Sequence, residues 1–526
     1  MRRYRNVICT FILILALLSG CGGRVKDIPI PSSTPEPSPK ATPLQAEFRP
    51  DMSRVDNVFT LNYKAQAGLN PYSCTDKDNL LLCQLIFEPL FQVKSDFSYE
   101  PVLVESYSGD GINFEFKIRS DITFHDGSPI SVWDAMYSVI TARDSKRYQG
   151  CFKSIRDVWV EGGNLRISLS QANTDFPLLL DIPVIRDGAA YTDYPAGTGP
   201  YLLGEYEGTI FLEAFKGHRD YDRLPINRIY LKEHSVEELV TAYEEAFIDL
   251  VTADPFEAGE PDFGGNSELR KLDTTVLHYL GVNGKSEFLS SDPKRRRLIA
   301  SMLNRSELAG KYIGGIEALL PVNPASAYYF KDIASGSVYK DIPAALIDSL
   351  TEDYDGDGKL EYVDSGEVKD FSLSLVVCNE DPAKLLTARA IAKQLESYGI
   401  DVRLRELTRN KFFDALYLGD YDLYYAEIRL KADFDLSELL SYGGTASYGL
   451  TDGEIGGKIR AFLAASGEDK ITAARSLYSY LAATCPLIPI AFEQLNLYTH
   501  RGAVTGLSPL ASNVFYKITE WKITLH

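Results

Sequence analysis

The stretch FSLSLVVCNEDPAKLLTARAIAKQLESYGIDVRLREL, residues 371–407, changes its hydrophobic period twice. Residues 371–377 form an apolar run rich in β-formers and predict a strand. Residues 385–398 have helical spacing and end at Gly399, a residue that suits the end of a helix. Residues 402–407 predict a second strand. A strand, a helix and a strand in this order form a β–α–β unit with parallel strands and a right-handed crossover, so the fold class is mixed α/β.

Similar local signals occur upstream. Residues 113–119 alternate between apolar and polar side chains after the turn Gly109-Asp110-Gly111, which predicts a hairpin. Ser131 precedes a helical pattern and Asp134 follows three residues later, as in a capping box. The other predicted strands cover residues 58–63, 165–169, 210–215 and 227–232, and a helix is predicted over 79–87.

The N-terminus has the features of an export signal. Three arginines within the first five residues precede an apolar run, residues 7–19, which is shorter than the ~20 residues that span a bilayer as a helix. The run ends in Leu18-Ser19-Gly20-Cys21, which is similar to the lipobox of bacterial lipoproteins. We therefore expect a lipoprotein signal peptide over residues 1–21, with Cys21 as the lipidated residue that becomes the mature N-terminus.

Residues 22–50 are rich in Pro, Ser and Thr and predict an extended tether rather than a packed element. The formal net charge of the chain is −19. Such an acidic surface argues against nucleic acid as a partner. Length points to more than one lobe, because 526 residues exceed the size of one core.

An odd number of cysteines, five, follows Cys21, and they lack the paired spacing of a zinc site. They are Cys74, Cys83, Cys151, Cys378 and Cys485. Buried free thiols are favoured, and a disulfide between Cys74 and Cys83 is the alternative. No nucleophile motif with a nearby base is evident, so an enzyme is not expected. No cofactor is expected either, and the one candidate is a structural calcium ion, discussed next.

One acidic segment approaches the pattern of a calcium loop. Asp353, Asp355, Asp357 and Asp364 stand at positions 1, 3, 5 and 12 of such a loop, with Gly356 at position 6. The aspartate at position 12 is shorter than the usual glutamate, and no pair of flanking helices is predicted. A plain acidic turn is therefore favoured over calcium binding.

Further motifs, taken together, resemble one family across nearly the whole body. Residues 122–130, ITFHDGSPI, are similar to that family's V-x-F-H-D-G-x-P motif, and residues 197–201, GTGPY, match another motif. Residues 86–90, IFEPL, and 486–490, PLIPI, resemble two more. The chain resembles the family 5 extracellular solute-binding proteins, which include oligopeptide, dipeptide and nickel receptors.

This resemblance implies a two-lobed periplasmic-binding-protein type II fold with an extra sub-domain and a ligand cleft between the lobes. Lobe one would comprise residues 51–272 and the C-terminal return 488–526, and lobe two would comprise residues 273–487. Its implied function is capture of a peptide by lobe closure and delivery to the permease of an ABC importer. A monomer, held by its lipid at the extracytoplasmic face of the cell membrane, is expected.

The resemblance also implies a ligand residue. Ala432-Asp433-Phe434 is similar to the family's A-D-Y, whose aspartate pairs with the α-ammonium of a peptide, and Asp435 is the alternative. The family's preceding Trp is missing, with Leu430 nearby. Two other functions stay open: a receptor for a metal chelate, sugar or opine, and a surface sensor without a transport role.

Overall fold

The computed structural model describes residues 59–256, 263, 266–338 and 350–524, all of which belong to one compact unit. The predicted signal peptide, the lipidation site Cys21, the tether 22–50 and the first residues of lobe one lie outside the described residues. Within the described ranges, no helix combines the length and apolar character needed to cross a membrane.

Two four-stranded sheets and two helices pack around the first hydrophobic core, and we call this part lobe one. One sheet has the order β1 (Phe59–Asn62), β10 (Arg228–Lys232), β9 (Thr209–Ala214) and β8 (Tyr201–Tyr206). The other has the order β4 (Val104–Gly109), β5 (Asn113–Ile118), β7 (Asn164–Leu169) and β6 (Ile155–Glu161). The helices are α2 (Lys77–Ile86) and α3 (Val132–Asp144), and a small ribbon is formed by β2 (Phe91–Val93) and β3 (Tyr99–Pro101).

The local predictions for this lobe are confirmed. Strands β4 and β5 form an antiparallel hairpin around the predicted turn. Ser131 and Asp134 form both halves of a capping box at the start of α3. The GTGPY motif contacts the end of α2, where a Cβ on Gly197 would stand 1.9 Å from the carbonyl oxygen of Ile86. Only glycine permits this close approach of two backbones.

The largest sheet has seven strands and forms the centre of lobe two. Strand β16 pairs in parallel with both β17 and β18, and α9 (Pro382–Glu396) connects β16 to β17, so the predicted β–α–β unit is confirmed. The path through the sheet is β11 (Leu250–Ala253), β19 (Leu487–His500), β12 (Ser267–Val282), β18 (Leu423–Arg429), β16 (Ser372–Cys378) and β17 (Asp401–Leu407), with β13 (Gly315–Glu317) on β19.

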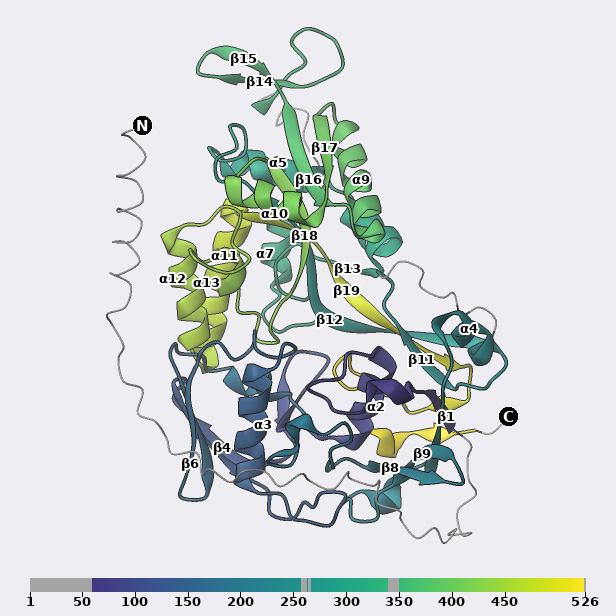
Figure 1. Ribbon diagram of the computed structural model, residues 1–526. Coiled ribbons are helices and arrows are strands. Elements are labelled where there is room, and N and C mark those ends of the chain that lie inside the picture. Colours follow the sequence, from purple (N-terminus) through teal and green to yellow (C-terminus); the bar gives the residue numbers. More distant parts are fainter. Residues whose placement is uncertain (1–58, 257–262, 264–265, 339–349, 525–526) are drawn as a thin grey trace, which may run out of the picture. The chain divides into compact units, whose positions relative to one another are not determined.

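Helices cover both faces of this sheet (Figure 1). The second core packs α9 and α5 (Pro293–Met302) on one face. The third core packs the other face against α10 (Arg409–Leu418), α11 (Ser437–Leu440), α12 (Gly453–Ala464) and α13 (Gly467–Thr484). The remaining elements include α4 (Val236–Glu244), α6 (Arg305–Glu307), α7 (Lys331–Gly336), β14 (Glu361–Asp364), β15 (Glu367–Asp370), β20 (Val504–Thr505) and β21 (Lys522–Ile523).

Strands β12 and β19 connect the two lobes. They pair side by side over most of their length, with a register irregularity between Asp273 and Leu277 (Figure 1). Leu272 belongs to the first core and Leu277 to the third. On β19, Phe492 belongs to the third core and Leu497 to the first. The chain therefore passes between the lobes twice, on two neighbouring strands.

The five cysteines of the described residues are all free thiols, as favoured by the sequence. Cys74, Cys83 and Cys485 are buried, and Cys151 and Cys378 are partly buried.

Candidate functional site

Strands β16 and β18 run parallel, so their carboxyl ends meet at one edge of the large sheet. Ligands of open α/β sheets bind outside the carboxyl ends of the strands. Here β18 leads into the loop 430–436, which holds both predicted ligand residues, and β16 leads into the start of α9. Two polar groupings lie at this edge, one around Asp433 and one around a cavity.

Asp433 is 1% exposed and already accepts hydrogen bonds. Its Oδ2 accepts from Asn173 Nδ2 at 2.7 Å, and its Oδ1 accepts from the backbone N–H of Asp435 at 3.1 Å. Phe434 between the two aspartates has a φ of 54°, which is unfavourable for a residue with a side chain. Its ring packs on Phe97 and Phe492, and this packing holds the loop in its conformation.

Asp435 has a structural partner. Lys431 Nζ lies 2.9 Å from its Oδ2, and the backbone N–H of Ser437 donates to its Oδ1. Burial opposes the charge of Asp435, but Lys431 and these hydrogen bonds hold its pKa below the usual range. Of the two predicted ligand residues, Asp433 is therefore the one that forms no ion pair with another residue in the described part of the chain.

Residues 173–175 of lobe one dock against lobe two next to Asp433. Thr174 donates from its N–H to Leu463 O at 2.9 Å. Asp175 Oδ2 lies 2.9 Å from Lys470 Nζ and accepts from the Tyr328 hydroxyl at 3.0 Å. Lys470 is only 4% exposed. The side chain of Asn173 thus belongs to a set of polar contacts that join the two lobes at the predicted ligand position.

Burial, followed by the nearby charge of Asp435, raises the pKa of Asp433 to about 6. An acid with a raised pKa stabilises the fold when protonated, and this contribution is lost as pH rises through about 6. We expect the unfolding free energy of the native chain, relative to Asp433→Asn, to fall by about 2 kcal/mol between pH 4 and 7. Urea unfolding of both proteins across this range measures the difference. Parallel pH profiles would contradict the expectation.

A cavity of about 450 Å³ opens at the same edge of the sheet. Typical small-molecule sites measure about 300–1,000 Å³ and are mostly apolar. This cavity is instead lined by five carboxylates and one arginine, with three apolar side chains. Its lining residues are Asp254, Phe256, Val276, Glu380, Asp381, Pro382, Glu427, Arg429 and Glu493.

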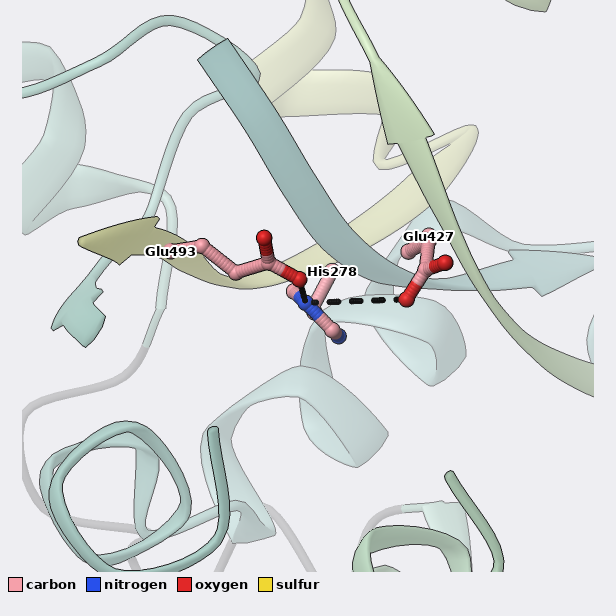
Figure 2. A group of neighbouring side chains, drawn as sticks. All are labelled: His278, Glu427 and Glu493. Carbon is pink, nitrogen blue, oxygen red and sulfur yellow. Dashed lines mark hydrogen bonds and ion pairs between the residues drawn. The ribbon is translucent and has the colours of Figure 1, made fainter. Parts of the chain in front are cut away.

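Two of the lining glutamates converge on a histidine (Figure 2). His278 lies on β12, opposite Glu427 on β18, and Glu493 lies on β19. The Nε2 atom of His278 is 2.7 Å from Glu493 Oε1 and 4.0 Å from Glu427 Oε2. Its Nδ1 atom is 2.7 Å from the Tyr425 hydroxyl. His278 is fully buried, and burial lowers its pKa to about 4, so the ring is neutral near pH 7.

The acidic segment near residue 355 also brings carboxylates together. Oxygens of Asp353, Asp355, Asp357 and Glu361 lie within 4.8 Å of one another. Asp364 lies on β14 and pairs with Lys369 at 2.8 Å instead. The three aspartates are exposed and accept hydrogen bonds from backbone N–H groups of their own turn. Both possibilities for this segment, a plain acidic turn and a calcium site, stay predictions.

The sequence did not single out the group around the cavity. One signal was present: Leu423, Tyr425 and Glu427 alternate along β18 on one face, and a glutamate breaks an otherwise apolar face. No sequence pattern indicated that residues 173–175 of lobe one contact lobe two.

A mixed α/β chain of two lobes with a polar site at the edge of the sheet between them is the architecture of periplasmic binding proteins. The family model for the bacterial extracellular solute-binding proteins, family 5 (middle), matches residues 98–445. The chain belongs to this family, as the motifs predicted. It is a family of binding proteins rather than enzymes.

Relatives in sequence match only part of the chain. The glutathione-binding protein GsiB of Escherichia coli (strain K12) is 28% identical over 164 residues, which are 28% of this chain and 32% of that protein. The aligned part thus spans about a third of that relative's length.

Solved structures share the fold over most of the chain. The periplasmic murein tripeptide-binding protein MppA, in an unliganded open form, has a TM-score of 0.71 at 14% identity, covering 90% of this chain and 98% of that one. The oligopeptide-binding protein AppA from Bacillus subtilis, in complex with a nonapeptide, has a TM-score of 0.57 at 17% identity, covering 89% of this chain and 99% of that one. A nickel ABC transporter protein from Bacillus halodurans has a TM-score of 0.68 at 17% identity, covering 86% and 96%. These likenesses confirm the predicted fold class.

Proposed function

We propose that this chain is the extracytoplasmic substrate-binding protein of an ABC importer and that it captures peptides between its lobes. The observation that supports this function most strongly is Asp433, a carboxylate buried where the two lobes meet. A peptide's α-ammonium is a cationic donor, and a buried carboxylate binds such a donor strongly. The names of similar proteins that bind a tripeptide, a nonapeptide and glutathione agree with this ligand class.

The contact between Asn173 and Asp433 suggests how the ligand enters. The Asn173 amide occupies the donor position that an ammonium would take, at 2.7 Å from the carboxylate. An incoming amino terminus would displace the amide and add a charge to the bond. Closure of the lobes over the peptide would then present a closed form to the permease.

Native mass spectrometry of the protein purified from its own host tests the ligand class directly. We expect mass increments that correspond to peptides and that disappear on partial unfolding. Increments that correspond only to sugars or opines, with no peptide, would favour the alternative receptor.

Anchoring at the membrane is part of the proposal, because the lipobox ends at Cys21. We expect Cys21→Ser to release the protein from the cell surface, since the thioether that holds the lipid cannot form. Metabolic labelling with a palmitate analogue, followed by cell fractionation, measures both effects. Undiminished labelling in the variant would show that the lipid is attached elsewhere.

A further inference from the structure

The carboxylates around the cavity differ in their structural roles. Asp381 is the N-cap of α9 and accepts from the N–H groups of Ala383 and Lys384. Glu380 accepts from the backbone N–H of Arg409, and Asp254 accepts from that of Phe256. These three acids stabilise caps and turns. Glu427 and Glu493 lie instead within regular strands, where neither role applies.

Acids on the apolar face of a buried sheet need compensation for their lost hydration. Glu427 is compensated at one oxygen only, because its Oε1 lies 2.8 Å from Lys384 Nζ. The other oxygen, Oε2, is buried without a hydrogen-bond partner, and it faces His278 Nε2 at 4.0 Å. Glu493 is 6% exposed, and its Oε1 lies 2.7 Å from the same nitrogen.

We propose that His278, Glu427 and Glu493 bind a divalent transition-metal ion, such as Zn²⁺ or Ni²⁺, at the wall of the cavity. Imidazole and carboxylate ligands suit these ions. Ligand atoms at bond lengths of about 2.1 Å in a tetrahedral site lie about 3.4 Å apart. The present separations from His278 Nε2, 2.7 Å to Glu493 and 4.0 Å to Glu427, lie on either side of that value. Small side-chain movements would therefore bring the three ligand atoms to bonding distance from one ion.

Tyr425 can pair with either tautomer of His278, including the one that binds a metal. A hydroxyl can donate or accept, so its oxygen can accept a hydrogen bond from Nδ1–H while the lone pair of Nε2 faces the ion. Metal-bound histidines usually donate their other N–H in this way. The cavity leaves the fourth position of the ion open, where a water molecule or a chelating solute of suitable size has room. The proposal does not depend on peptide capture at Asp433.

Calorimetric titration of the purified protein with ZnCl₂ alone tests the site. We expect one ion per chain at His278, and a loss of affinity of at least about tenfold in Glu427→Gln. Glu427 is partly exposed, so this variant should fold normally. Glu380→Gln is the matched control, because it removes the same charge from the same cavity without removing a proposed ligand. It should change the affinity by less than about threefold.

Cobalt(II) gives a second readout. Co²⁺ in the unmodified protein should show visible d–d absorption of a low-coordinate N/O site, and His278→Gln should abolish it. An Asp355→Asn variant excludes the exposed acidic turn as the site and should keep the absorption unchanged. Absence of saturable binding, equal losses in Glu427→Gln and Glu380→Gln, or loss of the signal in Asp355→Asn would each overturn the proposal.

Discussion

Replacing Asp433 by Asn is expected to weaken the binding of a peptide with a free amino terminus by tens to thousands of times. The reason is that a buried ammonium loses its counter-charge, which typically costs about 2–5 kcal/mol. The side chain keeps its size, and its one oxygen can still accept one of the two bonds that Asp433 now accepts. Loss of the other bond is offset because a buried charge is removed, so the melting temperature at pH 7 should change little. Calorimetry with one peptide measures the affinity.

Two controls make this result specific. Asn173→Ala removes the group that now occupies Asp433 and leaves the carboxylate intact, so peptide affinity should stay equal or rise. N-acetylation of the same peptide removes the ammonium and should weaken binding to the native chain as strongly as Asp433→Asn does. Equal affinities for the free and acetylated forms would reject both the residue and the mode of recognition.

Lys470→Met is expected to lower the unfolding free energy by about 3–5 kcal/mol, because it leaves Asp175 partly buried without its cation. Lys470 also lies 4.3 Å from the centre of the Phe462 ring, so the substitution removes a cation–π contact as well. Urea unfolding measures the loss. Lys458→Met in the neighbouring helix is the control, since its ion pair with Glu454 lies near the surface, with the glutamate exposed, and should contribute less than about 1 kcal/mol.

A double-mutant cycle then isolates the contact between the lobes. If Asp175 and Lys470 stabilise each other across the interface, Asp175→Asn combined with Lys470→Met should cost clearly less than the sum of the single variants. Strict additivity would mean that Lys470 acts within lobe two alone.

Much of the fold could be predicted because its signals are local. The β–α–β unit at 371–407, the β4–β5 hairpin and the capping box at Ser131 each depend on residues a few positions apart. The long strands β12 and β19 were not predicted as strands, since their irregular register and their change of core partner break a simple alternation.

The site was predictable only in part. Family motifs made Asp433 a candidate, and its ligand role stays a prediction. Its partner Asn173 is 260 residues away, and no local pattern links the two. The group around His278 depends on the pairing of three strands that are distant in the sequence. The acidic turn shows the same limit at short range: spacing alone placed Asp364 in the group, whereas the start of β14 brings Glu361 to it.

The return of the C-terminal segment to lobe one has a consequence for the order in which the chain folds. The first core needs Val514, Phe515 and Trp521, and Trp521 packs against Phe59 at the other end of the described chain. Val514 and Gln84, joined by a hydrogen bond, are 430 residues apart. Contacts of such long sequence separation form slowly. A chain made from its amino terminus therefore cannot complete lobe one until nearly its last residue is available.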